Sequence, residues 1–237
     1  MRRTEQNQEF EINRPPRSDS EGQEVFSKSQ IKIILAAESL FAKASIDSVS
    51  MREIASEAEQ RNHYAVQYHF GSREGLVRAV FRYRMEQMEE RRGQMLAEAE
   101  RDNTLHEART LLEMLYLPQL DLEDADGKHS YANFLCQYLL RERFTAFGDF
   151  GTPSPPHLDR IFKLLRIRLG YLPNAVAQRR LIAASLVFLN ILITHGDQAE
   201  AGQGKESFDA ALRDTLAQME LMISMPLAPE PSAVEST

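Results

Sequence analysis

Apolar positions recur along this chain at spacings of three and four residues. No stretch between its two polar ends alternates convincingly between apolar and polar positions. Spacings of three and four collect apolar side chains on one face of an α-helix, whereas alternation is typical of a half-buried strand. We therefore predict an all-α protein of roughly nine helices, with no sheet.

Capping residues place the boundaries of the first helices. Ser29 precedes the first apolar stripe, and Ser50 with Glu53 three residues later has the capping-box pattern before the second. Asn62 and Ser72 can cap the third and fourth helices. The predicted helices span residues 29–44, 51–58, 63–70, 73–96, 104–117, 130–147, 156–170, 174–196 and 206–224.

The chain divides into four segments. Residues 1–26 are polar and residues 226–237 are proline-rich, so both are predicted to be disordered. Residues 27–82 contain the short helices. Residues 83–225 form a larger helical body that begins within the long fourth helix, which we expect to bend or divide at Gly93.

Composition and charge narrow the class of protein. The apolar content of 43% is sufficient for a core, and the single cysteine, Cys136, excludes an intrachain disulfide framework. The net charge is −7, yet residues 27–84 carry 9 Lys and Arg against 6 Asp and Glu, while residues 85–237 carry 15 against 23. This asymmetry indicates local contact with a polyanion by an otherwise acidic protein.

Two short helices joined by a tight turn and braced by a preceding helix form a helix-turn-helix. The second helix of this motif exposes polar side chains to base edges in the major groove. From these residues alone, a DNA-binding face and an ordinary polar helix surface explain the pattern equally well. Candidate base or groove contacts are Asn62, His63, Tyr64 and Gln67, and candidate phosphate contacts are Tyr68, His69 and Arg73.

Residues 34–80 resemble the DNA-binding domain of the tetracycline-repressor (TetR) family of bacterial regulators. The matching segments are "AAESLFA", "SMREIASEA" and "YHFGSREGLV", and "QRN" at the turn is similar to one subgroup. The resemblance implies a homodimer, usually a repressor, that binds a near-palindromic DNA operator. It also implies a phosphate contact for Arg52 and a base or groove contact for Arg61. Ala44 and Glu59 stand where the family usually has glycines, and the turn is one residue longer than the common pattern.

Two C-terminal helices suit a subunit interface. Residues 181–193 are apolar nearly all round, and residues 206–224 carry an apolar stripe at helical spacing. The resemblance implies that these helices pair with their symmetry mates in a four-helix bundle. The same stripes also suit the core of a single subunit. The candidate interface residues are Leu186, Leu189, Phe208, Leu212, Leu216 and Met219.

The middle helices hold a ligand in this family, and aromatic residues between positions 131 and 150 can wall an apolar cavity. Candidate lining residues are Met88, Leu112, Leu115, Tyr116, Phe134, Tyr138, Phe144, Phe147, Phe162, Leu165 and Arg166. Plain core packing also explains each apolar position, and Arg166 suits either an anionic ligand head or the surface. The expected effector is an apolar small molecule, and no cofactor is expected.

No motif in the chain indicates an enzyme or a metal site. Zinc-protease helices, nucleophile elbows and phosphate-binding glycine loops are missing, and "LEDADGKHSYAN" lacks the first and last ligands of a calcium loop. Residues 181–193 are too short to span a bilayer and predict a helix buried on most sides. With no signal-peptide pattern either, we predict a cytoplasmic protein with no membrane partner. The alternatives are a helical module that binds a protein partner, or an activator with no small-molecule inducer.

Overall fold

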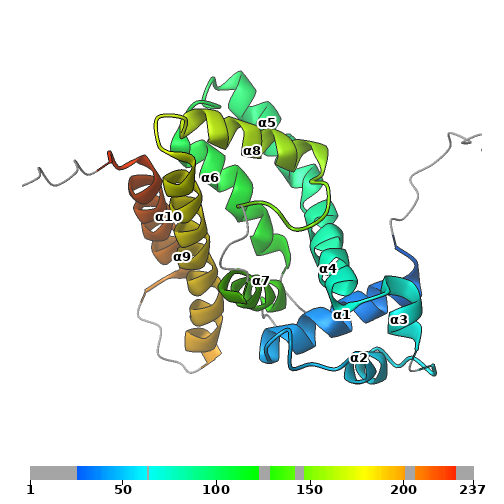
Figure 1. The fold of residues 1–237 in the computed structure, drawn as a ribbon. Helices are drawn as coiled ribbons and strands as arrows, with labels where there is room; N and C mark the ends of the chain where they lie inside the picture. The colour runs from blue at the N-terminus through cyan, green and yellow to red at the C-terminus, as the bar shows by residue number, and fades with distance from the viewer. Residues whose placement is uncertain (1–25, 63, 123–128, 142–146, 201–205, 228–237) are drawn as a thin grey trace, which may run out of the picture.

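Helices make up all the regular structure that the computed structural model describes (Figure 1), so the all-α prediction is confirmed over these residues. The described residues are 26–62, 64–122, 129–141, 147–200 and 206–227. The predicted arm and tail therefore lie outside them, except for Phe26, Pro226 and Leu227. The helices are α1 (Lys28–Lys43), α2 (Met51–Glu57), α3 (Ala65–Phe70), α4 (Arg73–Gln87), α5 (Glu89–Arg101), α6 (Ala108–Tyr116), the 3-10 helix η1 (Leu117–Leu122), α7 (Ser130–Arg141), α8 (Pro156–Arg168), α9 (Asn174–Glu200) and α10 (Phe208–Ser224).

Two of the predicted caps are confirmed. The Ser50 hydroxyl accepts a hydrogen bond from the Glu53 backbone N–H, and the Glu53 carboxylate accepts one from the Ser50 N–H at 2.7 Å. These bonds favour the charged carboxylate and lower the pKa of Glu53. At the start of α4, the Ser72 hydroxyl accepts from the Gly75 N–H at 3.0 Å. Both helices therefore begin where short-range chemistry satisfies their free N–H groups.

The starts of α1 and α3 differ from the prediction. Ser27 and Gln30 form the capping box of α1, and the hydroxyl of Ser29, the predicted cap, instead donates to Gln60. Asn62 does not cap α3 directly. Its side-chain oxygen accepts from the Tyr64 N–H at 2.9 Å and forms a turn before the helix, so α3 begins two residues later than predicted.

The long fourth helix is two helices, and the predicted break at Gly93 is wrong. The break falls at Met88, between α4 and α5, where no helix-breaking residue marks it in the sequence. Gly93 lies within α5 beneath the side chain of His157 at the start of α8, and a Cβ atom at this position would lie 2.8 Å from the His157 ring. The glycine therefore permits close packing of α8 on α5 instead of a bend.

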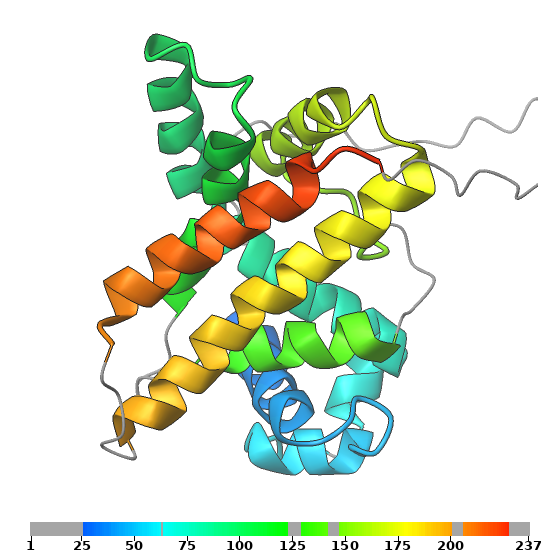
Figure 2. The same ribbon diagram turned by 90° about the vertical axis from the view of Figure 1, so that its left-hand side faces the viewer.

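Helices α9 and α10 run antiparallel and side by side along one flank of the molecule (Figure 2). The segment Asn174–His195 of α9 is long and apolar enough to cross a membrane by composition, a test that core helices also pass. Within the segment 181–193, which was predicted to be buried on most sides, six residues are buried, six are half-buried and Asn190 is exposed. One subunit covers α9 with α7 and α10 and leaves part of its apolar surface half-buried.

A buried ion pair joins the three N-terminal helices to the helical body. Glu38 of α1 accepts two hydrogen bonds from Arg84 of α4, at 2.7 and 2.6 Å, and a third from the Ser130 hydroxyl of α7 at 2.6 Å. Arg84 also donates to Gln87 at 2.9 Å. The Glu38 side chain is 1% exposed and the Arg84 side chain is 8% exposed. Such a bidentate pair fixes the orientation of α1 on α4 and α7.

An aromatic cluster fills the same junction. Phe134 of α7 lies between Phe41 of α1 and Phe81 of α4, with ring centroids 6.1 and 5.0 Å away. Phe81 continues the cluster to Tyr138 and Phe150, at 4.6 and 4.5 Å. Side chains of the N-terminal helices and of the body therefore share one packed core, and α7 lies across α1 (Figure 1).

Candidate nucleic-acid interface and internal cavity

Helix α3 buries one side and exposes the other. Ala65 and Val66 are buried against the neighbouring helices. Tyr64 and Tyr68 are 78% and 84% exposed, although tyrosine usually buries much of its ring. The ring of His69 contacts Tyr68 edge-on, with centroids 5.1 Å apart. The exposed side therefore offers aromatic and polar groups to a partner outside the subunit.

Two of the predicted base contacts already make local hydrogen bonds. The Gln67 side-chain amide donates to the carbonyl of Gly71, the residue that ends α3, although Gln67 itself is exposed. Asn62 uses its oxygen in the turn before α3. For Gln67, bidentate contact with an adenine requires release of the bond to Gly71. Asn62 keeps its amide N–H groups for a DNA contact.

The predicted cationic contacts lie around α3. Arg52 is exposed in the first turn of α2, and Arg61 is exposed in the turn before α3. Arg73 is half-buried and donates to the carbonyl of Ile46, which ties the loop before α2 to the start of α4. A guanidinium has five N–H donors, so this bond leaves others for a phosphate. His63 lies outside the described residues.

A tight turn brings the start of α4 beside the end of α3. Gly71 has φ 73°, a conformation that L side chains rarely adopt. A Cβ atom on Gly75 would lie 2.0 Å from the carbonyl oxygen of Phe70, where neither atom can move without shifting the backbone. The two glycines thus permit the approach of the two helices. The free N–H groups of the first turn of α4, which follows directly after this turn, suit a phosphate.

Glu59 adopts the left-handed conformation that the family pattern assigns to glycine. Its φ is 53°, and the Gln60 N–H bonds the carbonyl of Ala55 while the Glu59 N–H bonds that of Ser56. These are the two bonds of a Schellman motif, which ends α2 and opens the turn. Ala44 has φ −137° and ψ 168°, an extended conformation that needs no glycine. The turn therefore keeps its geometry at the cost of strain at one residue.

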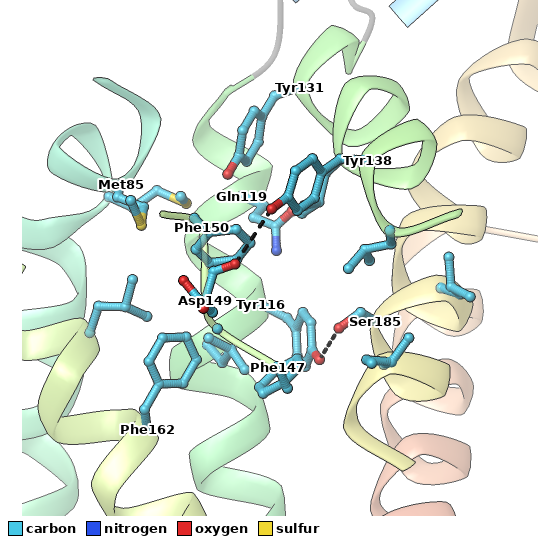
Figure 3. Close-up of a pocket in the computed structure, with 18 of the residues that line it drawn as sticks. Met85, Tyr116, Gln119, Tyr131, Tyr138, Phe147, Asp149, Phe150, Phe162 and Ser185 are labelled. Atoms are coloured by element: carbon cyan, nitrogen blue, oxygen red, sulfur yellow. Dashed lines mark hydrogen bonds between the residues drawn. The ribbon is translucent and has the colours of Figure 1, made fainter. Parts of the chain in front are cut away.

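A cavity of about 320 Å³ lies in the helical body, between α4, α5, α6, α7, α8 and α9. Its wall is mostly apolar and aromatic, and Figure 3 shows side chains from several helices converging on it. Volume and composition are those of a small-molecule site. The lining residues are Met85, Met88, Arg92, Leu115, Tyr116, Gln119, Tyr131, Leu135, Tyr138, Leu139, Leu140, Phe147, Gly148, Asp149, Phe150, Leu158, Phe162, Ile182, Ser185 and Leu186.

Several polar groups are buried in this wall. The Tyr116 hydroxyl and the Ser185 hydroxyl are hydrogen-bonded at 2.8 Å (Figure 3). Burial raises the pKa of Tyr116 and of Tyr131, because each phenol is charged only when deprotonated. Arg92 is 2% exposed, and desolvation lowers its pKa to about 10, although nearby Tyr131 partly opposes the shift. Gln119 is also buried, at 6% exposure.

The cavity contains some of the predicted lining residues and not others. Met88, Leu115, Tyr116, Tyr138, Phe147 and Phe162 line it. Leu165 and Arg166 line an adjoining hollow of about 390 Å³, which shares Phe147 and Phe162. Leu112 and Phe134 are fully buried in the core and line neither space, and Phe144 lies outside the described residues. Sequence reasoning missed Arg92, because a charged run in a helix usually indicates a solvated face. It also missed Gln119, which no local pattern marks.

The predicted interface residues also fall into two groups. Leu189, Leu216 and Met219 are 0–3% exposed within one subunit and have almost no surface to offer a partner. Leu186, Phe208 and Leu212 are only partly buried. Exposed apolar side chains that the prediction did not include are Ile167, Tyr171, Leu221 and Met225, between 53% and 77% exposed, on α8, α10 and the segments that follow them.

One comparison, with a family model, agrees with the helix-turn-helix geometry. A family model described as bacterial regulatory proteins, tetR family, matches residues 33–80, which contain most of α1, all of α2 and α3 and the first half of α4. No curated protein matched the sequence of this chain. One similar solved structure comes from work on the control of antibiotic production by bacterial hormones, with 19% identity, a TM-score of 0.46, and coverage of 82% of this chain and 97% of that chain. The N-terminal helix-turn-helix of this chain, over residues 33–80, is therefore that of a bacterial regulatory protein of the tetR family.

Proposed function

We propose that the protein is a homodimeric, ligand-responsive repressor that acts in the bacterial cytoplasm and binds a near-palindromic operator. The observation that supports this most is the exposed side of α3, where Tyr64, Gln67 and Tyr68 face outward within the domain that matches the family. Arg52 and Arg61 flank that side and are exposed. Cations beside a polar recognition helix supply phosphate contacts, and the helix itself supplies base contacts.

The flank formed by α9 and α10 supports a dimer. Apolar residues of α9 such as Leu186, Val187 and Ile191 are only half-buried by their own subunit. Leu221 of α10 is 70% exposed, and Phe208 and Leu212 are partly exposed. Exposed apolar surface of this kind marks an interaction site. A second copy placed there by twofold symmetry would set its α3 at a fixed distance from the first, as a near-palindromic operator requires.

The junction between α1, α4 and α7 supports a ligand response. Tyr131 and Tyr138 of α7 line the cavity, and Phe134 between them packs on Phe41 of α1. A ligand that moves α7 would therefore move α1, on which α2 packs, and α3 packs in turn on α2. The ligand acts only if it binds one arrangement better than the other, because it shifts a population that already exists.

Fluorescence anisotropy tests the proposal. A labelled duplex from the region upstream of the protein's own coding sequence is titrated beside a shuffled duplex of equal length, each at several salt concentrations. We expect two chains per upstream duplex and a preference for it over the shuffled one. We also expect the logarithm of the affinity to fall linearly with the logarithm of salt concentration, with a slope near −0.9 for each phosphate contacted.

The same titration separates the alternatives. A protein-interaction module would bind both duplexes weakly and equally. An activator would bind as a repressor does, and only a reporter gene placed downstream of the operator distinguishes the two. Addition of an effector should raise reporter expression for a repressor and leave it unchanged for a protein with no inducer.

A further inference from the structure

Arg92 is an unusual residue to find in an apolar wall. Its side chain lines the cavity, and the residue is 2% exposed. One N–H donates to the carbonyl of Met85 at 3.3 Å, and another contacts the sulfur of Met88 at 3.4 Å. The Nε–H group is buried with no hydrogen-bond partner. Burial of an arginine costs free energy that a paired carboxylate normally offsets.

The described residues provide no carboxylate that pairs with Arg92. Glu89 lies one turn earlier on α5, and its charge partly opposes the lowering of the Arg92 pKa, but it forms no ion pair with Arg92. One oxygen of its carboxylate accepts from the His157 N–H at the start of α8, and the other is buried with no hydrogen-bond partner. Among the described lining residues, Asp149 carries the one carboxylate; it is exposed and accepts from the Gly151 N–H at 3.0 Å. Among the described residues, Arg92 therefore lies in the cavity wall with no carboxylate hydrogen-bonded to it, and Glu89 stabilises its charge without direct contact.

Other donors face the same space. Figure 3 shows the side-chain amide of Gln119 and the hydroxyl of Tyr131 directed into the cavity. Gln119 is buried, and its amide oxygen has no hydrogen-bond partner. Because O and N of an amide exchange by a flip, Gln119 can turn two N–H donors toward a ligand. The phenol of Tyr131 lies close enough to Arg92 that each affects the pKa of the other.

We propose that the cavity binds an apolar carboxylic acid as its anion, with the carboxylate held by Arg92, Gln119 and Tyr131 and the apolar body among the aromatic side chains. This inference rests on the proposed ligand response and names the chemical class of the ligand. A carboxylate accepts several hydrogen bonds at once, and a guanidinium is its best-matched partner. The acid group replaces the missing anion and satisfies the unpartnered Nε–H.

The position of this carboxylate also explains how it would act on DNA binding. Arg92 contacts Met85 and Met88, the last turn of α4 and the break before α5. Helix α4 begins at Arg73, beside the recognition helix. A ligand that draws Arg92 toward the cavity therefore changes the contacts at one end of a helix whose other end lies at the proposed DNA interface.

Isothermal titration calorimetry on the full-length protein tests the proposal. The probes are 2-naphthylacetate and octanoate, each beside its primary amide, which has nearly the same shape and no charge. In at least one pair, we expect the acid to bind at least tenfold more tightly than the amide, the factor expected of a hydrogen-bonded buried charge. In Arg92→Met, the ratio should fall to about one. In Arg91→Met, the matched control, it should not change, because Arg91 pairs with Asp121 outside the cavity.

Two further readouts separate a ligand role from a structural one. Without ligand, Arg92→Met should melt at a higher temperature than the wild type, because the variant removes an unpaired buried charge. A lower melting temperature would assign Arg92 to structure and overturn the proposal. Gln119→Leu leaves Arg92 in place and should weaken the acid more than the amide. This variant serves as the test if Arg92→Met does not fold.

The outcomes also separate this proposal from the proposed function. Equal binding of acid and amide to the wild type would overturn the acid assignment and leave an apolar ligand site. Binding of neither would also overturn it. Operator anisotropy on the same preparation reports the DNA-binding function independently, so its loss, and not the loss of probe binding, would contradict that function.

Discussion

Removal of one partner of the ion pair between Glu38 and Arg84 should destabilise the protein strongly. In Arg84→Met, the Glu38 carboxylate remains 1% exposed and loses two hydrogen bonds of 2.6 and 2.7 Å, while the Ser130 hydroxyl can still donate. Loss of one partner of a buried pair costs about 3–5 kcal/mol. For a chain of this size, 1 kcal/mol corresponds to about 2–4 °C, so the melting temperature should fall by roughly 6–20 °C.

A double-mutant cycle isolates the pair from the packing around it. In Glu38→Leu/Arg84→Met, both charges are gone, and the apolar side chains fill a similar volume. The double variant should therefore unfold within about 2 kcal/mol of the wild type, because an apolar pair can replace a buried ion pair. Urea denaturation, followed by circular dichroism at the helix band, measures each free energy of unfolding. If the two single losses simply add in the double variant, the pair is not coupled and the reasoning is refuted.

Three further predictions follow from backbone and burial. Glu59→Gly should stabilise the protein by roughly 1 kcal/mol, since glycine adopts a φ of 53° without strain. Asn103, at φ 57°, is the comparison: asparagine tolerates this region, so thermal melts should show a smaller gain for Asn103→Gly. Gly75→Ala should unfold more easily than Gly71→Ala. A Cβ atom at position 75 would lie 2.0 Å from the Phe70 carbonyl oxygen, whereas one at position 71 would meet nothing within 4 Å. Equal losses of stability in urea denaturation would contradict this. Tyr116→Phe should lose about 1 kcal/mol at pH 8 with the bond to Ser185. In the wild type, the raised pKa of Tyr116 keeps this phenol protonated in the folded state while it ionises in the unfolded state above pH 10, so the free energy of unfolding falls as pH rises. The variant lacks this phenol, and its free energy of unfolding should fall less steeply over the same range. Parallel pH profiles for variant and wild type would oppose that assignment.

Local chemistry explains which parts of the fold the sequence could predict. The Ser50–Glu53 capping box and the Ser72 cap lie within a few residues of the N–H groups that they satisfy, so the sequence contains the whole interaction. The break at Met88 has no such local signal, since no glycine or proline stands there. Gly93 suggested a bend but serves the packing of His157, which is distant in the sequence.

The site follows the same rule. The exposed side of α3 was predictable because its apolar and polar positions separate within one short helix. The wall of the cavity was predictable only in part, since any buried aromatic residue matches the pattern. Phe134 shows the limit, because it lies in the aromatic cluster between α1 and α4 and not in the cavity. Arg92 lies in a charged run, and only the packing of other helices, α6 and α8 among them, against α5 buries it.

The central claim is that α3 reads the base sequence of an operator, and one comparison tests it most directly. The affinities of the wild type, Gln67→Ala and Arg52→Ala are measured by anisotropy for the upstream duplex and for its shuffled counterpart. We predict that Gln67→Ala loses affinity for the upstream duplex alone, by about 1–3 kcal/mol. Arg52→Ala should weaken both duplexes alike and reduce the salt slope by about one. Equal losses on both duplexes for Gln67→Ala would assign this side chain to the DNA backbone, and no effect of either change would contradict α3 as the recognition helix.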